Sequence, residues 1–437
     1  MSRVAPLLAL PLVLVGGLLA GCSKSETPQA ESSASSSVSA TAAKSECRQL
    51  DPSLQWHDGV REFLQKAIDA NSTCAGTAAP DAHKVAIFDW DNTVVKNDIG
   101  YGTNFYMLAS NLILQPPNQD WKQTSRYMTD AAAKALSKAC GTDVPAGKPL
   151  PTSTNTACAD EILAILDDKT TGGDAAFEGY DERRMTGAYA WGTALSAGYS
   201  ADELAGFAQK MKEQNLAAPV GATQKVGTKD MDGYIRVYPQ IKDLIGTLQG
   251  NGVDAWVVSA SPEPIVKVWA SEVGIKPDRV VGVRSVYDPA GKQTAHLMGC
   301  GGVPDGDDSV ITYIDGKRCW ANQVIFGVQG PAAFDQLAAD RRQVLAAGDS
   351  VTDVTFVGDA TAASLVINRN KAELMCRAYD GLFTNGGTWA VNEMFIEPLP
   401  QHDPYTCATA YTNSNGSKGP VLETDGKAIP DQVDSVY

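Results

Sequence analysis

Residues 85–93 read VAIFDWDNT, in which four apolar residues run directly into two aspartates two positions apart. An apolar run this short predicts a strand buried on both faces, as in a parallel sheet covered by helices. Chemistry in such sheets lies at the carboxyl ends of the strands, and alternation lets Asp89 and Asp91 project the same way. Two carboxylates about 4 Å apart repel by roughly 4 kcal/mol, so a cation or a shared proton must compensate them. The plainer interpretation is an acidic turn after a core strand.

Four later apolar runs predict further strands, and amphipathic segments between them predict helices. One of these runs ends in GDSVTD, which again delivers two carboxylates, Asp349 and Asp353, at a strand end. Another ends in Ser259-Ala260-Ser261, where Ser261 is predicted to cap a helix that begins at Pro262. The fold class expected is α/β, a Rossmann-like doubly wound parallel sheet. The expected strands after the first are residues 255–258, 280–283, 344–347 and 364–367.

A long block from residue 96 to 230 interrupts this alternation. It contains helical patterns, including the capping box of Ser200 and Glu203, and no apolar run that indicates a buried strand. We therefore predict a helical cap inserted into a catalytic core made of residues 46–95 and 231–437. A helix along Leu54, Val60, Leu64 and Ile68 is expected before the first strand.

The N-terminus has the features of an export signal, with Arg3 before an apolar run that extends to Ala20. The run ends in Leu-Ala-Gly-Cys, which resembles the lipobox of bacterial lipoproteins. That resemblance implies removal of residues 1–21 and a lipid on the thiol of Cys22. Residues 22–45 are small and polar and predict a flexible tether. The protein is expected in the cell envelope, facing outside the cytoplasm and held to a membrane by its lipid.

Besides Cys22 the sequence has eight cysteines, an even number that in an exported protein indicates disulfides. Eight cysteines can pair in many ways, and the spacing of these cysteines favours disulfides between neighbours in chain order. A zinc site is the alternative, but the sequence has no CxxC and only four histidines. The net charge of −15 and the lack of a basic run argue against nucleic-acid binding. The expected pairs are Cys47–Cys74, Cys140–Cys158, Cys300–Cys319 and Cys376–Cys407.

The motifs DWDNT, VVSAS, an intervening lysine and GDSVTD occur in this order at predicted strand ends. Together they resemble the four motifs of the haloacid dehalogenase (HAD) superfamily of phosphatases. The VVSASP form and the early position of the cap are similar to the phosphoserine and phosphorylcholine phosphatase branch. One departure is that Lys317 lies farther upstream of GDSVTD than is usual there, so Arg341 and Arg342 are weaker alternatives for the basic residue.

The resemblance assigns chemical roles that suit these residue types. Asp89 would attack phosphorus and form an aspartyl phosphate, while Asp91 would protonate the leaving oxygen and then activate water. Ser259 and Lys317 would bind the phosphoryl oxygens. The ordinary alternatives are a helix cap for Ser259 and a solvated surface charge for Lys317.

The same resemblance implies a Mg²⁺ cofactor, which suits oxygen ligands and keeps waters for a substrate. Its ligands would be Asp89, the main-chain carbonyl of Asp91 and Asp349, with Asp353 in support. The implied activity is Mg²⁺-dependent hydrolysis of a small phosphomonoester such as phosphorylcholine or phosphoserine.

Aromatic residues of the cap are the candidates for the leaving-group pocket, because aromatic faces bind quaternary ammonium groups. Trp191 and Tyr180 are the candidates, since they flank the charged residues 181–184, although a helix core residue is the more ordinary interpretation of Trp191. Two other functions stay open, a phosphotransferase of the same fold and a non-catalytic solute-binding lipoprotein. The sequence does not indicate the oligomeric state.

Overall fold

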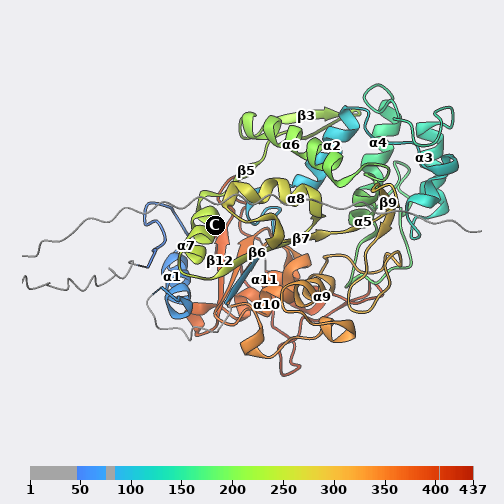
Figure 1. Cartoon of the computed structure of the whole chain (residues 1–437). Helices are drawn as coiled ribbons and strands as arrows, with labels where there is room; N and C mark the ends of the chain where they lie inside the picture. The colour runs from blue at the N-terminus through green and yellow to red at the C-terminus, as the bar shows by residue number, and fades with distance from the viewer. Residues whose placement is uncertain (1–46, 75–83, 403, 437) are drawn as a thin grey trace, which may run out of the picture. The chain divides into compact units, whose positions relative to one another are not determined.

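The computed structural model describes residues 47–74, 84–402 and 404–436, which belong to one compact unit. Its centre is a six-stranded parallel sheet with the strand order β12-β11-β10-β1-β6-β7 (Figure 1). When the six strands are numbered in chain order and the sheet is read from β7, the order is 3-2-1-4-5-6, the arrangement of the Rossmann fold. The strands are β1 (Val85–Phe88), β6 (Asp254–Pro262), β7 (Val280–Val283), β10 (Leu345–Gly348), β11 (Ala363–Asn368) and β12 (Trp389–Glu393).

Alternate residues of β1 belong to different hydrophobic cores, one on each face of the sheet. Ala86 and Phe88 pack in the core that also holds the apolar residues of α1, α7 and α8. Val85 and Ile87 pack in the core that holds those of α9, α10 and α11. The predicted doubly wound parallel sheet is therefore confirmed. These helices are α1 (Val60–Asn71), α7 (Pro239–Gly250), α8 (Glu263–Ala270), α9 (Asp315–Val324), α10 (Val354–Gly358) and α11 (Ala372–Asp380).

A mainly helical insertion separates β1 from β6, and α6 in the insertion packs on α8 (Figure 1). The chain leaves and re-enters the core side by side, because β2 (Val95–Lys96) pairs antiparallel with β5 (Arg236–Val237). This pair lies close to the predicted cap boundaries at 96 and 230, and the division into core and cap stays a prediction. The helices of the insertion are α2 (Ile99–Ala109), α3 (Asp130–Cys140), α4 (Thr156–Ile165), α5 (Gly187–Ala194) and α6 (Ala201–Ala217).

Two local predictions are wrong, and several strands were not predicted. Ser261 does not cap a helix, because β6 continues through Pro262 and α8 begins at Glu263. Leu54 lies outside α1, which begins at Val60. The hairpin of β3 (Thr223–Val226) and β4 (Lys229–Asp232) has no apolar signal, because it is largely exposed. The edge strand β12 was missed as well.

All four predicted disulfides are present. They join α3 to α4 (Cys140–Cys158), a loop to α9 (Cys300–Cys319), α11 to the C-terminal segment (Cys376–Cys407) and the residues before α1 to those after it (Cys47–Cys74). Four bridges are compatible with an oxidising compartment outside the cytoplasm. Among the described helices none is long and apolar enough to cross a bilayer. The predicted signal peptide, tether and Cys22 lie outside the described residues.

The C-terminal segment is attached to the end of β11 by the buried carboxylate of Asp434. This carboxylate accepts hydrogen bonds from the hydroxyls of Tyr379 and Tyr405 and, at 3.1 Å, from Asn368 Nδ2. The backbone amides of His402 and Val436 donate to it as well. One acidic side chain therefore satisfies donors from three separate parts of the chain.

We expect Asp434→Ala to lower the free energy of unfolding by about 3 kcal/mol, because buried donors lose their acceptor. Urea unfolding of the variant and the wild type measures this loss. Asp425→Ala is the matched control, since among the described residues the Asp425 side chain pairs only with exposed Lys427. Equal unfolding midpoints for the Asp434 variant and the wild type would contradict the assigned role.

Candidate active site

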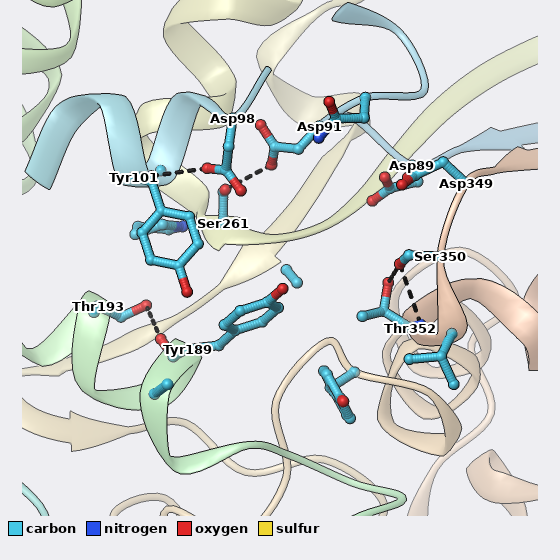
Figure 2. Close-up of a pocket in the computed structure, with 18 of the residues that line it drawn as sticks. Asp89, Asp91, Asp98, Tyr101, Tyr189, Thr193, Ser261, Asp349, Ser350 and Thr352 are labelled. Atoms are coloured by element: carbon cyan, nitrogen blue, oxygen red, sulfur yellow. Dashed lines mark hydrogen bonds between the residues drawn. The ribbon is translucent and has the colours of Figure 1, made fainter. Parts of the chain in front are cut away.

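The four predicted aspartates lie at the carboxyl ends of two adjacent strands. Asp89 and Asp91 follow β1, and Asp349 and Asp353 follow β10. The strands pair in parallel, and the Asp89 amide donates to the Ala347 carbonyl at 2.9 Å. The strand order reverses at this pair of strands, which is where open α/β sheets bind their ligands. Asp89, Asp91 and Asp349 line a cavity of about 170 Å³, a size that suits a small substrate (Figure 2).

Lys317 is fully buried, and its ammonium group lies between two of these carboxylates. Nζ is 2.5 Å from Asp89 Oδ1 and 2.6 Å from Asp353 Oδ1. The lysine is on the first turn of α9, just after Ile314, whose φ of 46° is unusual for a β-branched residue. Arg341, an alternative for this role, is exposed, and its guanidinium donates to the Phe326 carbonyl. The structure thus places Lys317 against Asp89.

Asp353 contacts Lys317 and the turn that follows β10. Its Oδ1 accepts from Lys317 and Thr352, and its Oδ2 accepts the backbone amides of Asp349 and Ser350, each at 2.9 Å. Because both oxygens are engaged, Asp353 holds Lys317 and the turn after β10 in position. The Asp353 side chain does not line the cavity.

The oxygen donors suit a divalent cation. Carboxylate oxygens of Asp89, Asp349 and Asp353 lie within 4.8 Å of one another, and all three residues are buried. With Asp353 already engaged, Asp89 and Asp349 are the side chains that can hold a hard cation such as Mg²⁺. They share the Thr93 hydroxyl, which is 3.3 Å from Asp89 Oδ2 and 3.0 Å from Asp349 Oδ1.

Burial and mutual repulsion raise the pKa of the site carboxyls. For Asp89, burial and then Asp353 raise the pKa well above its ordinary value, and Lys317 opposes them. Burial also raises the pKa of Asp349, against the effect of Arg369. Burial by itself would lower the pKa of Lys317, but Asp353 and Asp89 hold it above its ordinary value, so the lysine is charged. A bound cation would relieve the repulsion among the carboxylates.

Asp91 is held separately from Asp89 (Figure 2). Its Oδ1 accepts the Ile99 amide at the start of α2 at 2.7 Å, and its Oδ2 accepts the Ser261 hydroxyl at 2.7 Å. Burial, and next the neighbouring Asp98, raise the pKa of Asp91 well above its ordinary value. The side chain is therefore oriented by one group from the core and one from the insertion.

Ser259, predicted to bind phosphate, is fully buried. Its hydroxyl accepts the Ser261 amide at 3.0 Å and lies 3.4 Å from Asp91 Oδ2. The cavity is lined by Ser261, which sequence reasoning had treated as a helix cap. The two serines are two residues apart in β6, so their side chains point to the same face of the strand. This spacing was the sequence signal that both lie near the site.

Tyrosines form the wall opposite the carboxylates. Tyr101, Tyr189 and Tyr313 line the cavity, and successive rings meet edge to face at centroid distances of 6.0 and 5.9 Å. Asp98, whose carboxylate accepts the Tyr101 amide at 2.8 Å, lines the same cavity beside Asp91 (Figure 2). Burial raises the pKa of Asp98 to about 6. Sequence reasoning had placed Tyr101 and Tyr189 only in a general set of cap aromatics.

Trp191 and Tyr180, the favoured pocket residues, do not line this cavity. Trp191 is fully buried, its indole N–H donates to the Thr124 hydroxyl at 2.8 Å, and it packs beside Trp121 and Phe177. Tyr180 lines a separate surface hollow and packs edge to face on Tyr127. The core interpretation of Trp191 is correct, because α5 is buried on nearly every side.

Two basic residues of the cavity wall were missed. Arg369 and Lys371 follow β11, the strand next to β10, and both line the cavity. Arg369 Nη1 donates to Asp349 Oδ2 at 2.7 Å. The rule that selected Asp89 and Asp349, a polar residue at a parallel strand's carboxyl end, also selects Arg369.

No protein-family model matches this sequence, and no curated protein matches it either. Among solved structures the chain is similar to a conserved protein of unknown function from Anaerococcus prevotii, with 18% identity over 78% of this chain and 93% of that chain and a TM-score of 0.56. It is also matched to a substrate-bound phosphoserine phosphatase complex (12% identity, 65% of this chain and 85% of that chain, TM-score 0.29). A phosphoserine phosphohydrolase-like protein from Francisella tularensis matches at 14% identity over 70% of this chain and 94% of that chain, with a TM-score of 0.30. The likeness to the Anaerococcus protein shows a shared fold alone. We therefore infer the function from the residues of the site.

Proposed function

We propose that this protein is a Mg²⁺-dependent phosphomonoester hydrolase that acts through an aspartyl phosphate on Asp89. The observation that carries the proposal is the buried Lys317 in contact with Asp89, beside Asp349 at the next strand end. A permanently charged lysine at a buried carboxylate suits a site that receives an anion. The resemblance to the HAD motifs supports the same chemistry.

In the first step an Asp89 oxygen attacks phosphorus, a new O–P bond forms, and the bond to the leaving oxygen breaks. Asp91 donates its proton to that leaving oxygen, and the burial that raises its pKa favours the protonated form needed. Ser261 and the Ile99 amide orient the Asp91 carboxyl for this transfer.

In the second step water attacks the phosphorus of the aspartyl phosphate, and Asp91 accepts the proton of the water. The O–P bond to Asp89 breaks, which releases inorganic phosphate and restores both aspartates. Lys317 remains charged throughout and stabilises the phosphoryl oxygens near Asp89. Mg²⁺ held by Asp89, Asp349 and the Asp91 carbonyl would neutralise negative charge on the phosphoryl group.

Phosphorylcholine and phosphoserine are the substrates we favour within this class, because both leaving groups carry a cationic nitrogen. Tyr101, Tyr189 and Tyr313 offer aromatic faces and edges on the wall opposite the carboxylates, and Asp98, beside Asp91, adds a carboxylate to the same cavity. These residues replace Trp191 and Tyr180 as the proposed recognition site. An export signal and a lipid on Cys22 would place the reaction at the outer side of a membrane.

We expect the soluble fragment that begins at residue 46 to hydrolyse p-nitrophenyl phosphate with added Mg²⁺. Removing divalent cations with EDTA should lower turnover at least about a hundredfold, and Mg²⁺ should restore it. Release of p-nitrophenolate measures both rates.

EDTA-resistant turnover would contradict the metal requirement. A protein that binds phosphomonoesters without hydrolysing them would favour the solute-binding alternative. Added alcohols that yield new phosphate esters would instead favour a phosphotransferase.

A further inference from the structure

Arg369 has hydrogen-bonding capacity that the catalytic residues do not use. A guanidinium group carries five N–H donors, yet within the described residues that of Arg369 makes one hydrogen bond, to Asp349. Its side chain is 30% exposed and lines the cavity, so unused donors are accessible from the pocket. These donors suit the planar oxygen pair of a carboxylate or a phosphate.

Lys371 lies two residues farther along and lines the same cavity. Among the described residues its ammonium group has no hydrogen-bond or ion-pair partner. Burial lowers the pKa of Lys371, and Arg369 lowers it further through like-charge repulsion. Two cations are thus held near each other at the pocket wall, with Asp349 as the carboxylate that attracts both.

Arg369 and Lys371 follow β11, which pairs with β10 on the side away from β1, the strand that leads to Asp89. Asp349 Oδ1 shares the Thr93 hydroxyl with Asp89, whereas Asp349 Oδ2 accepts from Arg369. The phosphoryl group to be transferred must lie at Asp89, where Lys317 supplies the positive charge. Arg369 and Lys371 therefore face a different part of the substrate.

We propose that Arg369 and Lys371 form a second anion subsite, which binds an anionic group on the leaving group of the substrate. The ligand chemistry is a carboxylate or a second phosphate, either of which offsets the repulsion between the two cations. The inference rests on the proposed phosphatase function and narrows its substrates to phosphomonoesters with two anionic groups. Phosphorylcholine lacks the second group, so the subsite favours the phosphoserine type.

O-Phosphoserine and O-phosphoethanolamine form a matched pair for the test, because they differ only in a carboxylate. Each is added as a competitor of p-nitrophenyl phosphate hydrolysis, and its inhibition constant is measured. We expect O-phosphoserine to compete about tenfold better with the wild type, since a charge-assisted contact is gained. Lys371→Gln should reduce this ratio to about threefold or less, and Lys371→Arg should retain most of it.

Lys210→Gln, which removes an exposed lysine on α6, is the control and should keep the wild-type ratio. A wild-type ratio near one would overturn the subsite while leaving the phosphatase proposal intact. The same holds for a ratio that Lys371→Gln leaves unchanged. Absence of p-nitrophenyl phosphate hydrolysis would overturn the phosphatase function, and the subsite with it.

Discussion

Asp89→Asn is expected to lower phosphatase turnover by at least about a thousandfold while the protein stays folded. The substitution keeps the size and shape of the side chain but removes the nucleophilic charge. It also removes one of several buried like charges, and burial together with Asp353 already disfavours the ionised form of Asp89. The melting temperature should therefore stay equal to that of the wild type or rise.

Release of p-nitrophenolate and thermal unfolding of the same preparation separate the two effects. Asp167→Asn, an exposed position in the insertion, is the matched control and should change neither quantity. Substantial remaining turnover in a folded Asp89→Asn protein would show that another group is the nucleophile. Trapping of labelled phosphate on the wild type, and its loss in the variant, would locate the covalent step directly.

The positions of the aspartates at the candidate site were predictable because their signal is local. Asp89 and Asp349 each follow a short apolar run, and the parallel sheet brings the ends of β1 and β10 together. Lys317 had no such signal, since a lysine at the start of a helix is ordinarily exposed. Only the order of the motifs indicated it, and its burial is a property of the folded chain.

The aromatic wall of the cavity was less predictable, because tertiary packing decides which aromatic residue faces the cavity. In α5, Ala188, Ala190 and Trp191 are buried together, so no polar face distinguishes a pocket side from a core side. Tyr189 lines the pocket and Trp191 packs in the core, although they are two residues apart. Tyr313 comes from a loop of the core that no pattern connected with the insertion.

The disulfides were predictable for a different reason. Each bridge joins cysteines 18 to 31 residues apart, within one local substructure. Cys140 and Cys158, for example, end and begin two helices that pack on each other. Pairing of chain neighbours therefore succeeds wherever the fold keeps consecutive elements adjacent.

Lys317→Met is the second substitution with a large expected effect, because it removes the cation between two buried carboxylates. Leaving buried charges without a partner costs about 3–5 kcal/mol of unfolding free energy. Turnover should fall at least about a hundredfold, since the positive charge beside the nucleophile is lost as well. Urea unfolding in EDTA measures the stability, so that a bound cation does not compensate for the missing lysine.

The double variant Lys317→Met with Asp353→Asn distinguishes the structural role of the lysine from its catalytic role. Asp353 uses both oxygens within the protein, so its charge matters for holding Lys317 and not for the substrate. Removing that charge should return at least about 1 kcal/mol of the stability lost in Lys317→Met. Turnover should not return, because Asp89 still lacks its cation. Recovery of turnover along with stability would mean that Lys317 only supports the fold, and the phosphoryl-binding role assigned to it would be wrong.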